Sequence, residues 1–256
     1  MNSQINNQNI THDSVTYGKW ALLNKKYFSH PKIISELFNL FAASKVSLPI
    51  LPKIIDLGSA EGLVGEFFWK KLGGSLTLLD IVKEHLEQNL NPHTQKICKN
   101  ILEFNEKNTY DLIIMSSVLH YFSKTNQMRV LKNIRNALKQ KGYFLLKVFV
   151  QQPEFLGTFL KLSKIMDRNP QLLSQKRLEN NFKKAGFSFQ FLDNAIPWNV
   201  SLTELKNRYS VSQDKILKMK QIIKNSSSQE RSYFTNKKES LILPVPYKVY
   251  LLRKEN

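Results

Sequence analysis

The sequence predicts an α/β protein with a doubly wound, mostly parallel sheet, and the alternation of its apolar patterns carries that prediction. Between residues 53 and 150, short apolar runs typical of buried strands alternate with segments whose apolar residues recur at helical spacing. Such alternation is typical of βαβ units, whose right-handed crossovers place helices on both faces of a sheet. A length of 256 residues, 42% of them hydrophobic, is enough to bury a sizeable core.

Two regions precede the first strand. Residues 1–14 are polar and are expected to be disordered, because they offer little to bury. Residues 15–48 carry apolar side chains at helical spacing and predict two N-terminal helices that are separated at Ser29-His30-Pro31. We expect residues 15–256 to form a single domain.

The core of this domain is predicted over residues 50–193. The first strand is expected to begin at Lys53, and five further strands are expected at 75–80, 95–98, 110–116, 143–150 and 187–192. The helices of this core are expected at 61–72, 82–90, 124–140, 155–166 and 173–185.

A helical cap insertion is expected over residues 194–246, between the last two strands. Its helices are predicted at 203–209 and at 212–224, where Ser212 is the N-cap, and 226–229 is expected to be a loop. The last strand is predicted at 247–253.

The net charge of +18 is the unusual bulk property of this chain. A basic chain can bind nucleic acid or an anionic membrane. Only seven of its 38 basic residues are Arg, however, whereas Lys, Asn and Ile are all abundant, as in the product of an AT-rich coding sequence. Because phosphate and base recognition favours Arg, we prefer compositional drift to a nucleic-acid role.

Several signals are missing from the sequence. No apolar run approaches the roughly 18 residues of a membrane span, and the N-terminus lacks the basic and apolar regions of a signal peptide. Cys98 is the single cysteine, so neither a disulfide framework nor a cysteine-rich metal site is expected. We expect a cytoplasmic protein with no metal site and no stable membrane insertion.

The turn after the first strand, Asp56-Leu-Gly58-Ser59-Ala60-Glu-Gly62, is the main clue to a ligand. A phosphate-binding P-loop pattern is absent, and Ala60 and Leu63 stand where a dinucleotide fingerprint needs glycine. S-adenosylmethionine has no phosphate and carries a sulfonium and an ammonium, so an acid such as Asp56 at the strand end suits it. A structural turn without a ligand remains the alternative.

Polar residues follow the next three strands at the edge where ligands bind in such sheets. Asp80 ends the second strand, where an acid can accept hydrogen bonds from a ribose diol; a solvated strand-end acid is the alternative. Asn100 and Ile101 follow the third strand and suit the edge and the face of an adenine, unless Asn100 is a plain turn residue. The fourth strand leads through Ser116 to His120 and is expected to end at the same crevice.

In this order and spacing the motifs resemble class I, seven-strand S-adenosylmethionine-dependent methyltransferases. The resemblance covers about residues 50–150 and, more loosely, 175–256. Its strongest elements are the Asp56–Gly62 loop, Asp80 and the strand from Tyr110 to His120, whereas Ala60 and Asn100 depart from the family's Gly and Asp. The resemblance implies the strand order 3-2-1-4-5-7-6, with the last strand antiparallel, and the conversion of S-adenosylmethionine to S-adenosylhomocysteine. The cofactor-binding residues that it implies are Asp56, Gly58, Ser59, Ala60, Gly62, Asp80, Ile81, Asn100, Ile101, Ser116 and Ser117.

Methyl transfer from a sulfonium is a direct displacement, which needs a general base only if the nucleophile arrives protonated. His120 is the best candidate for that base, Tyr121 is a weaker one, and a histidine that only lines the pocket is the alternative. The other four histidines, at positions 12, 30, 85 and 93, are expected at the surface.

Aromatic residues outside the core sheet are candidates for an acceptor pocket. They are Tyr17, Trp20, Trp198 and Tyr209, and the alternative for each is packing of the cap onto the sheet. We expect a small organic acceptor. An RNA acceptor and a non-catalytic module of the same fold are the alternatives, and the sequence specifies neither the methylated atom nor the oligomeric state.

Overall fold

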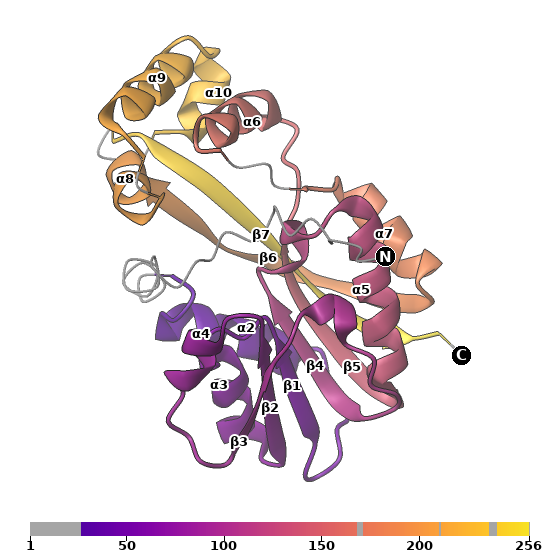
Figure 1. Ribbon diagram of the computed structural model, residues 1–256. Coiled ribbons are helices and arrows are strands. Elements are labelled where there is room, and N and C mark those ends of the chain that lie inside the picture. Colours follow the sequence, from indigo (N-terminus) through magenta and orange to yellow (C-terminus); the bar gives the residue numbers. More distant parts are fainter. Residues whose placement is uncertain (1–26, 168–170, 210, 236–239, 256) are drawn as a thin grey trace, which may run out of the picture.

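Seven strands form one sheet in the computed structural model, which describes residues 27–167, 171–209, 211–235 and 240–255 (Figure 1). The strand order is β3-β2-β1-β4-β5-β7-β6. Strands β1 to β5 pair in parallel, and β7 runs antiparallel between β5 and β6. The predicted fold class and strand order are therefore confirmed.

The first four strands match the sequence pattern closely, whereas the last three are longer than predicted. Their bounds are β1 (Lys53–Leu57), β2 (Ser75–Asp80), β3 (Thr94–Cys98), β4 (Tyr110–Ser116), β5 (Leu138–Phe149), β6 (Phe187–Ser201) and β7 (Ile242–Lys254). β6 continues beyond its predicted end because most of its further residues pair with β7, with register shifts at Phe191/Asp193 and Ala195/Trp198.

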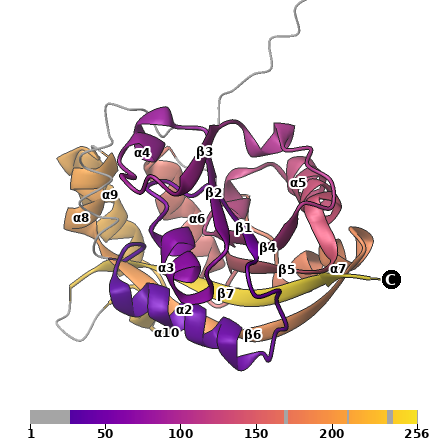
Figure 2. The ribbon, with the colours of Figure 1, turned by 90° about the horizontal axis from the view of Figure 1, so that it is seen from below.

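Helices cover both faces of the sheet, as the alternation predicts (Figure 2). On one face lie α2 (Pro31–Ala43), α3 (Leu63–Leu72) and α4 (Lys83–Glu87), and on the other α5 (Lys124–Ala137) and α7 (Gln175–Lys184). The strand side chains alternate accordingly: Ile54 packs with the first group and Ile55 with the second.

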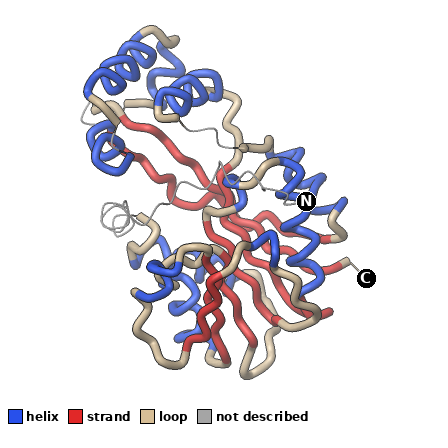
Figure 3. Tube along the Cα trace, viewed as in Figure 1, coloured by secondary structure: helices blue, strands red, loops and turns tan. Residues whose placement is uncertain are grey.

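A helical cap sits at the far end of the long β6–β7 hairpin (Figures 1 and 3). It consists of α6 (Leu156–Ile165), α8 (Leu202–Tyr209), α9 (Gln213–Lys224) and α10 (Ser228–Tyr233). Met219 and Phe234 of the cap are buried in the same apolar cluster as Phe68 of α3, so the cap and the core share one packed interior.

Serine caps explain where the cap helices begin. The Ser212 side chain accepts a hydrogen bond from Lys215 N, which confirms it as the N-cap of α9. The expected loop at 226–229 is wrong in part, because Ser227 caps α10 in the same way through Glu230 N. This N-cap was not predicted because the three consecutive serines at 226–228 are typical of a loop.

The N-terminal region is described only from Tyr27 onward. The second of the two predicted N-terminal helices is α2, and His30 caps it by accepting from Lys32 N. The predicted tail at 1–14, the first predicted helix up to residue 26, and Tyr17 and Trp20 lie outside the described residues. Within the described ranges, no helix is long and apolar enough to cross a membrane.

Candidate functional site

The loop after β1 is held in a left-handed conformation at three alternate positions. Gly58, Ala60 and Gly62 have φ values of 69°, 51° and 82°. A Cβ on Gly62 would lie 2.2 Å from Leu78 Cδ1, and one on Gly58 would lie 2.5 Å from Val118 Cγ2, so only glycine fits at those two positions. The loop is thus packed tightly against β2 and the segment after β4.

The side chain of Asp56 stabilises the first turn of α3. This helix begins after Gly62, which has no side chain to cap it, and Asp56 Oδ2 accepts a hydrogen bond from Gly65 N at 2.9 Å. Asp56 is 2% exposed. Burial raises its pKa to about 7, against the Gly65 hydrogen bond and with a smaller contribution from the charge of Asp80.

Asp80, at the end of β2, ties the neighbouring loops together. Its Oδ2 accepts from Ala60 N at 2.8 Å, and its Oδ1 accepts from Val82 N at 2.9 Å. His85 Nδ1 lies 3.8 Å from the same Oδ1. The surface prediction for His85 is wrong: it is 5% exposed because α4 packs it against Asp80, and burial lowers its pKa.

The segment after β3 lies beside this acid, because Cys98 pairs with Asp80 in the sheet and Lys99 N donates to Asp80 O. Asn100 Oδ1 accepts from Leu102 N and caps a short 3₁₀ turn. Ile101 points into the core, whereas Ile81 is 41% exposed and offers the freer apolar surface.

The segment after β4 completes the crevice. Ser116 pairs with Lys147 of β5, and Ser117, with a φ of 64°, donates its N–H to Lys147 O at 2.8 Å. The buried Ser59 Oγ, Ser117 Oγ and His120 Nδ1 have no hydrogen-bond partner within the described part of the chain. Unpaired buried polar atoms are rare, and a bound ligand would satisfy them here.

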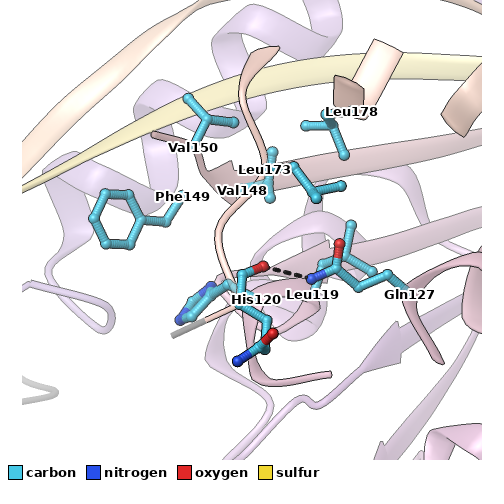
Figure 4. A pocket seen from close by; sticks show the side chains of 9 residues that line it. Leu119, His120, Gln127, Val148, Phe149, Val150, Leu173 and Leu178 are labelled. Carbon is cyan, nitrogen blue, oxygen red and sulfur yellow. Dashed lines mark hydrogen bonds between the residues drawn. The ribbon is translucent and has the colours of Figure 1, made fainter. Parts of the chain in front are cut away.

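His120 lines a small pocket together with residues packed on the α5 side of the sheet (Figure 4). Gln127 closes one side by donating from Nε2 to Gln171 O at 2.7 Å. The His120 ring lies 4.4 Å from the ring of Tyr121 and 6.0 Å from that of Phe149. Burial lowers the pKa of His120 to about 4, so the imidazole is neutral at physiological pH.

An aromatic cluster forms on the other side of β5. Trp198 stacks on Tyr27 at 5.7 Å and meets Phe28 edge-on at 4.9 Å, and Tyr247 stacks on Tyr27 at 5.9 Å. The hydroxyl of Tyr27 donates to the carbonyl of Ile196, which ties this cluster to β6.

Lys147 lies under this cluster and is the residue that sequence reasoning missed. Its Nζ lies 4.4 Å from the centre of the Tyr27 ring, 4.8 Å from that of Tyr247 and 5.7 Å from that of Phe28. The available signal was a single lysine within an apolar strand, Tyr143 to Val150. Of the predicted pocket residues, Trp198 is here, whereas Tyr209 lies in α8 and its side chain is outside the description.

The carboxyl edge of the sheet thus brings together the predicted residues that follow β1, β2, β3 and β4. The hydrogen bonds and close contacts of Asp80, Gly58 and Ser117 link the four segments directly. Among the described residues, no group of three His, Cys, Asp or Glu side chains is arranged to hold a metal ion.

Comparison with known proteins agrees with this fold. The profile of a family described as "Methyltransferase domain" matches residues 26–190, well over half of the chain. The sequence matches no curated protein.

Solved structures share the architecture at low sequence identity. The YcgJ protein of Bacillus subtilis has a TM-score of 0.70 at 15% identity, covering 86% of this chain and 98% of its own. A candidate methyltransferase of Bacillus halodurans C-125 has a TM-score of 0.74 at 13% identity, covering 87% and 100%. The 1,6-didemethyltoxoflavin-N1-methyltransferase of Burkholderia thailandensis, with bound S-adenosylhomocysteine, has a TM-score of 0.53 at 13% identity, covering 96% and 91%.

The fold and the crevice define a class I, Rossmann-like methyltransferase. The chain belongs to the methyltransferase-domain family, and its methyl donor is S-adenosylmethionine. The expected enzyme class is confirmed.

Proposed function

We propose that this enzyme transfers the methyl group to a small organic acceptor by direct displacement. The observation that carries the proposal is the aromatic wall of Tyr27, Trp198 and Tyr247, which lies beside Lys147, the register partner of Ser116 at the end of β4. Such a wall suits a compact acceptor that is shielded from water.

The residues present fit S-adenosylmethionine. In this proposal Asp80 would hold the ribose, Ile81 and Asn100 would contact the adenine, and Asp56 would attract the cationic end. Ser59 and Ser117 offer hydroxyls that have no partner within the described ranges. When it is bound, the cofactor supplies an activated methyl group on its sulfonium.

His120 acts in this proposal by shaping the site. With a pKa of about 4, its imidazole is too weak a base to be an effective general base toward a hydroxyl group at neutral pH. Alignment and exclusion of water then supply most of the rate enhancement. Tyr121 packs on His120 and shapes the same wall.

The RNA alternative finds less support in the placement of the charges. Exposed lysines occur on α3 (Lys70, Lys71), on α5 (Lys132), on α7 (Lys183, Lys184) and on the cap helix α9 (Lys218, Lys220), which is to say over both faces and the cap. A backbone-binding surface would gather them along one groove. The proposed location remains the cytoplasm.

The non-catalytic alternative rests on Ala60 and Asn100. Ala60 still adopts the left-handed conformation, and its N–H still reaches Asp80, so the loop has kept its shape. Asn100 still caps the turn beside β3. Both observations favour a working cofactor site.

Titration calorimetry with S-adenosylmethionine and S-adenosylhomocysteine tests the cofactor step, and no binding at millimolar ligand would end the proposal. Transfer of a tritiated methyl group then tests the acceptor class. We expect label in the small-molecule fraction of a cell extract, whereas label confined to the RNA fraction would establish the alternative.

A further inference from the structure

Lys147 occupies a position that the cofactor does not explain. Side chains at the carboxyl ends of β1, β4 and β5 alternate between the two faces of the sheet. Asp56, Ser116 and Lys147 each lie two positions from a residue packed on the α2–α3 side, namely Ile54, Ile114 and Leu145. They therefore share that face, and Ser116 and Lys147 are direct register partners.

Aromatic contacts link the Lys147 side chain to the segment that follows β4. Phe149, two residues further along β5, lies 6.0 Å from the ring of Tyr247 and 6.0 Å from the ring of His120. Tyr247 in turn lies 4.8 Å from Lys147 Nζ. The rings of Tyr247 and Phe149 thus connect the amine of Lys147 to the imidazole of His120.

The surroundings of this amine are unusual for a structural lysine. Lys147 is 2% exposed, and the described residues offer its Nζ three aromatic rings but no carboxylate within ion-pair distance. Glu36 acts on it from further away, and Glu36 Oε2 already accepts from Ile196 N at 3.3 Å. Burial lowers the pKa of Lys147 to about 7.

A buried lysine without an anion is costly, and fully buried lysines are rare unless they are paired. The aromatic rings stabilise an ammonium in part, but they do not replace a counterion. A negatively charged ligand in the adjoining space would supply one and would favour the charged amine.

We propose that Lys147 is the recognition residue for an anionic group, a carboxylate or a phosphate, on the methyl acceptor. Tyr27, Tyr247 and Phe28 hold the ammonium in place, and the aromatic wall packs against the rest of the acceptor. This inference rests on the proposed function and narrows its acceptor to an anionic small molecule.

The test uses the full-length protein and three variants: Lys147→Met, which removes the charge at similar volume, Lys147→Arg, which keeps it, and the matched control Lys161→Met on the exposed surface of α6. Calorimetry with S-adenosylhomocysteine first shows that each variant keeps its cofactor site. A small-molecule extract of the source organism is then divided on an anion exchanger, and each fraction is assayed for transfer of a tritiated methyl group.

We expect the acceptor in the anion-retained fraction. In Lys147→Met, kcat/KM should fall about 100-fold, chiefly through KM, as when one partner of a buried charge pair is removed. Lys147→Arg should keep part of the activity, and Lys161→Met should match the wild type.

An acceptor in the unretained fraction, or equal transfer by Lys147→Met and Lys161→Met, would overturn the assignment of Lys147 while leaving the proposed function intact. Absence of any labelled small molecule would instead remove the proposed function, and this inference with it.

Discussion

The two halves of the crevice are built differently. The cofactor half, formed by the segments after β1, β2 and β3, holds its carboxylates with backbone N–H groups: Gly65 on Asp56, and Ala60 and Val82 on Asp80. The proposed acceptor half, formed by the ends of β4 and β5 with Tyr27 and Tyr247, surrounds the buried amine of Lys147 with aromatic rings. The first half is preorganised by the backbone, whereas the second leaves a charge to be balanced by what binds.

The largest effect on cofactor binding should come from removing the carboxylate of Asp80. In Asp80→Ala, affinity for S-adenosylmethionine should fall at least about tenfold, because a ribose partner and the acceptor for two backbone N–H groups are lost together. Calorimetry measures it, with the exposed Asp193→Ala as control. Unchanged affinity would remove Asp80 from the site.

The charge of Asp56 should appear as a pH dependence of cofactor binding. The pKa of about 7 means that its ionised, cation-attracting form becomes about tenfold more populated between about pH 6 and about pH 8. Affinity for the sulfonium cofactor should therefore rise with pH by about that factor. Asp56→Asn should flatten the profile, and an undiminished slope in that variant would assign the titration to another group.

In the proposed acceptor half, replacing Lys147 should change the stability of the protein. Because Lys147 is buried without a nearby carboxylate, Lys147→Met should raise the free energy of unfolding by about 1 kcal/mol. Urea denaturation measures it, and exposed Lys161→Met should stay within about 0.5 kcal/mol of the wild type. A clear loss of stability in Lys147→Met would mean that the amine serves the fold.

The smallest effect concerns Ala60. A left-handed alanine is strained by about 1 kcal/mol, and Ala60→Gly relieves that strain but makes the unfolded chain more flexible. We expect a net stabilisation below about 1 kcal/mol by urea denaturation. Ala42→Gly, on the exposed side of α2, should instead lower the free energy of unfolding. A change of the same sign in both variants would show that Ala60 is not strained.

The same contrast explains what the sequence could predict. The cofactor half consists of short contiguous motifs at strand ends, so the loop at 56–62 and Asp80 could be singled out from the sequence, whereas the strand order followed only from the family resemblance of these motifs. The acceptor half joins Tyr27, Lys147 and Trp198, which are far apart in the chain and carry no local pattern. The burial of His85 was missed because it depends on a tertiary contact with Asp80. The N-cap at Ser227 was missed because composition alone does not reveal its local hydrogen bond with Glu230 N.

The length of the β6–β7 hairpin has a mechanical consequence. β7 is continuous from Ile242 in the cap to Lys254 beside the core, and Tyr247 lies midway along it. Tyr247 and Trp198 thus lie on the same two strands that carry the cap helices. Any displacement of the cap would therefore shift both of these rings together, and with them the surroundings of Lys147.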